Sequence, residues 1–127
     1  MKLSELTNEI VFEGSLDSKL IQFGKVDFDE FNPISIPKLP QRNASIKFSE
    51  KSLRFPRGHF HEDEKKAIAL HSFANHELLA IEMMAAALSL YPHHTDELRR
   101  FKLGVISSLK DEQKHFRLYV KQLNKLG

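Results

Sequence analysis

The sequence has no cysteine and no tryptophan, and it contains no long apolar run. Without cysteine, disulfides, Cys-ligated zinc and iron–sulfur clusters are excluded, so any bound metal must take His, Asp or Glu as ligands. No apolar run reaches the roughly 18 residues of a membrane span, and the first residues lack the apolar core of a signal peptide. We therefore expect a cytoplasmic protein with no membrane partner.

An excess of charge of one sign is also missing. Lys and Arg number 19 against 17 Asp and Glu, and they spread over the chain. No basic field indicates nucleic acid, so we expect no such partner. Hydrolase and nucleotide-binding motifs, such as Gly-x-Ser-x-Gly or a phosphate-binding glycine loop, are absent. The length of 127 residues suits one domain, and we expect residues 1–127 to form it.

Residues 1–60 predict short helices followed by a wrapping segment. From Leu3 to Phe23 a weak helical period, interrupted at Gly14, favours two short helices. Between Gly24 and Gly58 lie four of the five prolines, each of which disfavours helix at the residue before it. We predict an extended proline-rich strap that lies over the helices. Its apolar side chains should pack on their surface: Phe28, Phe31, Ile34, Ile36 and Leu39.

Residues 61–127 predict two long helices of similar length. The first begins near Glu62, where acidic residues suit the helix macrodipole, and ends at Tyr91 before Pro92. The second has Thr95 as its N-cap and continues to Leu126. A short link between two long helices indicates an antiparallel hairpin, the unit of up-and-down bundles. The predicted fold class is all-α, with this hairpin as half of a four-helix bundle.

Two carboxylates interrupt the apolar faces of these helices. At about 100° per residue, Glu77 falls in the middle of one apolar face and Glu112 in the other, with His115 about 60° to one side. An unpaired ionised carboxylate in a core costs several kcal/mol. Compensation could come from a metal ion, from protonated His115 or from an arginine. The strap offers Arg42, Arg54 and Arg57.

Glu112 and His115 form a Glu-x-x-His spacing, which places both side chains on one helix face within reach of the same ion. Ferritin-like di-iron and di-manganese proteins take a Glu from each of two helices and a Glu-x-x-His from each of the other two. Glu77, Glu112 and His115 are half of that ligand set. The alternative is a buried hydrogen-bonded network of the same three residues without metal.

The segments Phe73-Ala74-Asn75-His76-Glu77-Leu78-Leu79-Ala80-Ile81-Glu82 and Asp111-Glu112-Gln113-Lys114-His115-Phe116 carry a family resemblance. They resemble the bacterial ferritin-like family catalogued as domain of unknown function 455. The likeness covers most of the chain and is weaker in its earlier part. It implies a ferritin-like fold and favours a metal role for the inward residues.

The resemblance further implies a second Glu helix and a second Glu-x-x-His helix after the region matched here. Because the sequence ends at Gly127, we expect a homodimer, or another chain that supplies the second half, to complete the centre. The implied cofactor is a pair of iron ions, with manganese as the other option. The implied activity is an O₂-dependent oxidoreductase of unknown substrate. The alternative is a truncated, non-catalytic helical interaction module or fragment of that family.

Four histidines outside these motifs receive no ligand role at this point. His59 and His61 could bind metal as a His-x-His pair, but polar residues are ordinary at a helix start, and we favour that interpretation. His93 and His94 lie in the predicted interhelical turn, where polar residues are also common. We expect them to be ordinary loop residues.

A second polar stripe follows the first long helix. Around the helix axis, Glu82 lies about 140° from Glu77. His71 and Asn75 lie about 20° from Glu82, so the three residues form one stripe. We expect this stripe to be solvated or to contact the strap. His76 points about 100° away from Glu77, and we assign it no ligand role. The pattern leaves the roles of Glu82, His71 and His76 open.

Overall fold

The computed structural model describes residues 1–43, 46 and 56–126. It contains four named helices: α1 (Leu3–Phe12), α2 (Leu16–Lys19), α3 (Asp63–Leu90) and α4 (Asp96–Leu126). The described residues form no strand beyond an isolated bridge between Lys2 and Asp27. The all-α fold class is confirmed. None of the described helices has the length and apolar character that crossing a membrane requires.

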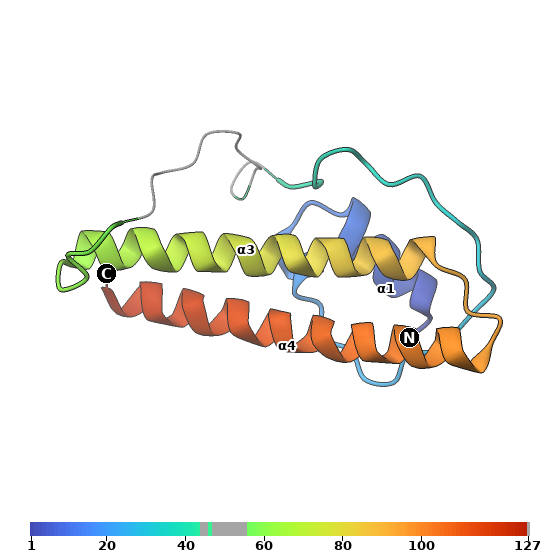
Figure 1. The fold of residues 1–127 in the computed structure, drawn as a ribbon. Helices are drawn as coiled ribbons and strands as arrows, with labels where there is room; N and C mark the ends of the chain where they lie inside the picture. Colours follow the sequence, from blue (N-terminus) through green and yellow to red (C-terminus); the bar gives the residue numbers. More distant parts are fainter. Residues whose placement is uncertain (44–45, 47–55, 127) are drawn as a thin grey trace.

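The long helices α3 and α4 lie side by side and run antiparallel, joined by a short turn (Figure 1). Acidic side chains, Asp63 and Glu64, occupy the first turn of α3. At the start of α4 the Leu98 N–H donates to the Thr95 hydroxyl at 3.2 Å, as expected for an N-cap. The predicted helix ends agree with the observed ones because caps and Pro92 act locally.

The two short N-terminal helices are also confirmed. The Ser15 hydroxyl caps α2 by accepting from the Ser18 N–H at 3.1 Å. The segment after α2 returns beside the start of α1, where the Leu3 N–H donates to the Asp27 carbonyl at 2.9 Å. It then runs along the hairpin and packs Phe28 and Ile36 against the core. Of the predicted contacts, Leu39 is instead exposed.

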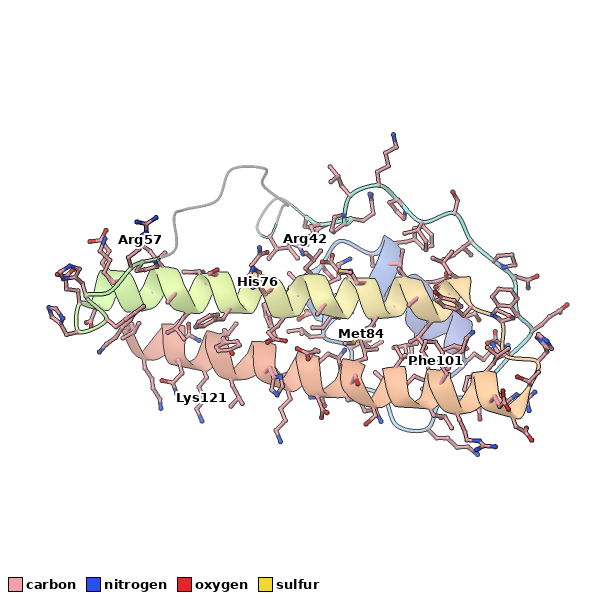
Figure 2. All side chains as sticks on the ribbon, in the orientation of Figure 1. Arg42, Arg57, His76, Met84, Phe101 and Lys121 are labelled. Atoms are coloured by element: carbon pink, nitrogen blue, oxygen red, sulfur yellow. The ribbon has the colours of Figure 1, made fainter. Side chains whose placement is uncertain are left out.

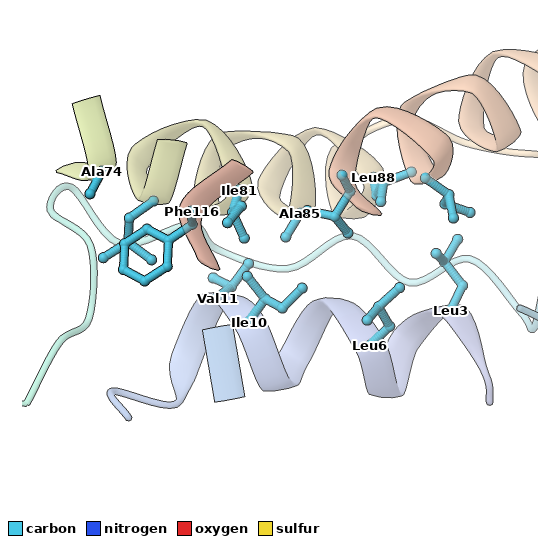
Figure 3. Close-up of a cluster of buried hydrophobic side chains, with 12 residues drawn as sticks. Leu3, Leu6, Ile10, Val11, Ala74, Ile81, Ala85, Leu88 and Phe116 are labelled. Carbon is cyan, nitrogen blue, oxygen red and sulfur yellow. The ribbon is translucent and has the colours of Figure 1, made fainter. Parts of the chain in front are cut away.

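The core lies between α1 and one side of the hairpin (Figure 3). Leu6 and Ile10 of α1 are fully buried and face Ile81 and Ala85 of α3. Phe116 of α4 closes the same cluster. In Figure 1, α1 lies behind the two long helices. One side of the α3–α4 seam is therefore covered by the chain's own N-terminal residues.

Glu82 joins the N-terminal segment, the strap and α3 in one buried ionic cluster. Its carboxylate lies 3.2 Å from the Lys19 ammonium, which is fully buried and also donates to the Ile10 carbonyl at 2.6 Å. The Arg42 Nε donates to both Glu82 oxygens at 3.1 and 3.2 Å. Arg42 also donates to the Asn75 side chain. Glu82 and Asn75 of the second polar stripe thus contact the strap, and His71 of the same stripe is exposed to solvent.

A second buried lysine holds the turn between the long helices. The Lys102 ammonium is fully buried and lies 2.9 Å from Nδ1 of His93, whose Nε2 lies 2.5 Å from the Asp29 carbonyl. These partners assign a neutral His93 that accepts at Nδ1 and donates at Nε2. His93 lies in the loop between the long helices, as predicted, but it is buried there, because Phe28 and Phe31 of the strap enclose its ring.

Replacing Glu82 by Ala should lower the free energy of unfolding by about 3–5 kcal/mol, because the buried Lys19 ammonium would lose its carboxylate. Urea denaturation at neutral pH measures this change. The matched control is Asp111→Ala on the exposed side of α4, for which we expect a change within about 0.5 kcal/mol. Equal effects of the two substitutions would contradict the role assigned to Glu82.

Stability should rise with pH in the alkaline range. Burial lowers the pKa of Lys102 below its ordinary 10.5, while Asp29 opposes the shift. Between the two pKa values the unfolded chain binds more protons than the folded one, so the free energy of unfolding increases as pH rises through that window. Lys102→Met should flatten this rise in urea titrations at successive pH values. An unchanged slope would contradict the assignment.

Candidate metal centre

Glu77 of α3 and Glu112 and His115 of α4 meet across the seam of the hairpin. The His115 Nδ1 lies 3.6 Å from a Glu112 oxygen and 3.9 Å from a Glu77 oxygen. One donor atom from each residue lies within 4.8 Å of the other two. Glu112 and His115 are neighbours because they are one turn apart, and the antiparallel pairing of the helices brings Glu77 to them. The structure therefore brings together all three predicted site residues.

These side chains lie at the border of the core and not in its middle. Glu77 and Glu112 are 20% and 23% exposed, and His115 is 49% exposed. On each long helix the buried residues are centred about 80° around the axis from the carboxylate, at about 100° per residue. The expectation of central burial was wrong in this respect. Its physical reason is that α1 covers one side of the seam only.

The other side of the seam carries an apolar surface that the described residues cover only in part. We call it the open face: Phe73, Glu77, Met84, Tyr91, Phe101, Glu112, His115 and Tyr119. Its aromatic rings pair across the helices, Phe73 with Tyr119 at 5.6 Å and Tyr91 with Phe101 at 5.7 Å between centroids. Figure 2 shows Met84 and Phe101 between the two long helices. Phe73, Tyr91 and Phe101 are exposed.

At about 100° per residue, Phe73 lies on the apolar stripe of α3, and Phe101 and Tyr119 lie on that of α4. An apolar stripe on a helix records which residues avoid water, but it does not record which neighbouring element covers them. Here α1 covers part of each stripe, and Phe73 and Phe101 lie outside the covered part. The sequence alone therefore could not predict which apolar residues of the two helices would be left exposed on the open face.

The three side chains do not hydrogen-bond one another. Distances of 3.6 and 3.9 Å exceed those of hydrogen bonds, so the three residues form loose ion pairs when His115 is protonated. Among the described residues, Arg42 neutralises Glu82 and not this pair, and Arg57 is exposed. Arg54 lies outside the described residues. A cation held by both carboxylates would complete the local charge balance.

The donor set suits a first-row transition metal. Two carboxylates and one imidazole provide oxygen and nitrogen ligands of the kind that bind iron and manganese. Three side chains are nonetheless too few for two ions, so a complete two-metal centre needs ligands from elsewhere. The residues present fit one half of such a centre.

Comparison with known proteins adds one finding. The profile of the family described as "Protein of unknown function (DUF455)" matches residues 4–127, which is nearly the whole chain. Neither a search of curated proteins nor a search of solved structures finds a match.

Without metal, Glu112 should make no favourable contribution to stability. Glu112→Gln removes one of two carboxylates whose oxygens lie within 4.8 Å of each other. We expect the free energy of unfolding, measured in urea with a chelator at pH 8, to stay unchanged or to rise by up to about 1 kcal/mol. Glu82→Gln is the matched control and should lower it. A clear loss for Glu112→Gln would instead indicate a structural network.

Proposed function

This chain belongs to the DUF455 family, and we propose that its hairpin provides half of a ferritin-like two-metal carboxylate centre of the oxidoreductase kind. The observation that carries the proposal is the convergence of Glu77, Glu112 and His115, from two helices, on the open face. Glu77 and Glu112 lie among exposed aromatic residues, where two neighbouring carboxylates do not stabilise a single hairpin. A functional role explains their position better than a structural one.

Each ligand has a role that its position supports. Glu112 would bridge or chelate, His115 would bind terminally, and Glu77 would be the carboxylate from the neighbouring helix. Iron is the metal we favour, with manganese as the other option. When bound, non-haem iron supplies the O₂ and one-electron chemistry that amino-acid side chains lack. The geometry assigns no substrate.

A second hairpin on the open face would complete the centre. A two-fold axis through this face would place two copies of Glu77, Glu112 and His115 opposite each other, which gives four carboxylates and two imidazoles. This is the ligand set of a di-iron carboxylate bundle. The same association would cover the exposed rings of Phe73 and Phe101, whose burial favours it. A second copy of this chain is the partner we propose, and a separate chain with the same motifs is the alternative.

The exposed aromatic residues also support a second candidate function. An apolar surface of this kind is typical of a protein interaction site, so the hairpin could act as a non-catalytic interaction module. Both candidates predict association through the open face. Metal binding separates them, because the interaction module needs no ion.

The test is to purify the chain under reducing, iron-supplemented conditions and to measure bound iron together with mass in solution. We expect about one iron per chain in a dimer, which corresponds to one two-metal centre per pair. Glu112→Ala and His115→Ala should lose the iron, whereas Asp111→Ala, on the same helix, should keep it. A dimer without metal under every loading condition would overturn the metal centre and favour the interaction module.

A further inference from the structure

A second group of ligand atoms lies at the turn before α3. The His59 Nδ1 and the His61 Nε2 lie 4.0 and 3.9 Å from the same oxygen of Glu62. One donor atom from each of the three residues lies within 4.8 Å of the others. The two imidazole rings are 6.0 Å apart between centroids and tilted by 57°. Two nitrogens and one oxygen therefore face a common point in front of the helix.

The backbone conformation brings these three residues together. His59 has a φ of 63°, in the left-handed region that few non-glycine residues adopt, and Gly58 before it has a φ of 142°. The Glu62 N–H donates to the His59 carbonyl at 3.0 Å and closes the turn. This turn brings the ring of His59 back beside the carboxylate at the helix start. The convergence is thus a property of the fold at this point.

We propose that His59, His61 and Glu62 form a surface site for a divalent transition metal ion of the zinc class. Two imidazoles and a carboxylate are three ligands that such an ion accepts, with a water molecule or an outside donor in the fourth position. Magnesium and calcium are disfavoured, because they prefer oxygen ligands throughout. The site is separate from Glu77, which lies 15 residues along α3 from Glu62, or roughly 22 Å at 1.5 Å per residue.

The two distances between the carboxylate and the imidazoles need a small adjustment, and the imidazole donors lie within 4.8 Å of each other. Bonds of about 2.0–2.1 Å in a tetrahedral arrangement place two donors about 3.4 Å apart. The present 3.9 and 4.0 Å are therefore about half an ångström too long. His59 and His61 are exposed and rotate without disturbing the core. The same distances exceed those of hydrogen bonds, so the three side chains do not satisfy one another in the protein alone.

Charges of both signs surround the turn, because Lys65 and Lys66 follow the acidic residues directly. The positive end of the α3 macrodipole opposes a bound cation, but Glu62 is followed by Asp63 and Glu64 in the first turn of the helix. These three carboxylates more than offset the partial charge of a helix terminus, which is about half an elementary charge. The strap side contributes Arg57, which is exposed and free to move away from the ion.

Zinc titration tests the proposal. The background is the full chain carrying Glu112→Ala and His115→Ala, so that the centre on the open face cannot bind. Calorimetry should show one Zn²⁺ per chain. Loss of a residue that only hydrogen-bonds a metal ligand typically weakens metal binding ~10–100-fold. Because His59 and His61 would bind the ion directly, His59→Ala and His61→Ala should each weaken zinc binding by at least that much. His94→Ala, an exposed histidine in the other turn, is the matched control and should leave the affinity unchanged.

A second measurement uses the same background, in which the centre on the open face cannot compete for the ion. A substoichiometric amount of Cu²⁺ should broaden the ring proton signals of His59 and His61 before that of His94. Zinc affinity unchanged by both histidine substitutions, or equal broadening of all three signals, would overturn the site. Because this readout does not depend on Glu77, Glu112 or His115, failure of the centre on the open face would leave it intact.

Discussion

The packing of α1 against one side of the α3–α4 hairpin is the constraint on which the remaining structure depends. Leu6 and Ile10 bury themselves against Ile81 and Ala85, and this contact fixes which half of each long helix is inside. At about 25 cal/mol per Å² of apolar surface removed from water, burial of these side chains is a large share of the net stability of a small protein. The same packing leaves the open face outside, where the candidate ligands lie.

Two kinds of inward carboxylate result from this one-sided packing. Glu82 faces the covered side, where Lys19 and Arg42 neutralise it within the chain. Glu77 and Glu112 lie at the edge of the open face, where the charged partner within 4.0 Å among the described residues is His115. The two cations that pair with a buried carboxylate, Lys19 and Arg42, therefore both neutralise Glu82. This difference is the physical reason why we give Glu82 a structural role and propose a metal role for Glu77 and Glu112.

Local signals in the sequence were sufficient for the helix ends, because Thr95 and Pro92 act within a turn of their own positions. The spacing of Glu112 and His115, together with an antiparallel partner, was sufficient to bring Glu77 into the same group. The burial of Lys19 and Lys102 was not predictable, since it depends on which segment packs over them. For the same reason the stripe of Phe73 and Phe101 could not show that its outer half is uncovered. Tertiary neighbours decide burial, and no single stretch of sequence specifies them.

In the proposed assembly, Glu77, Glu112 and His115 hold metal at an interface between two hairpins. Diffraction from crystals of the iron-loaded protein, recorded at the iron absorption edge, would locate the ion. We expect anomalous density between these three residues, with the same residues of a second hairpin facing them across the open face. Density confined to other positions, or an open face left against solvent in the loaded protein, would contradict the proposed assembly.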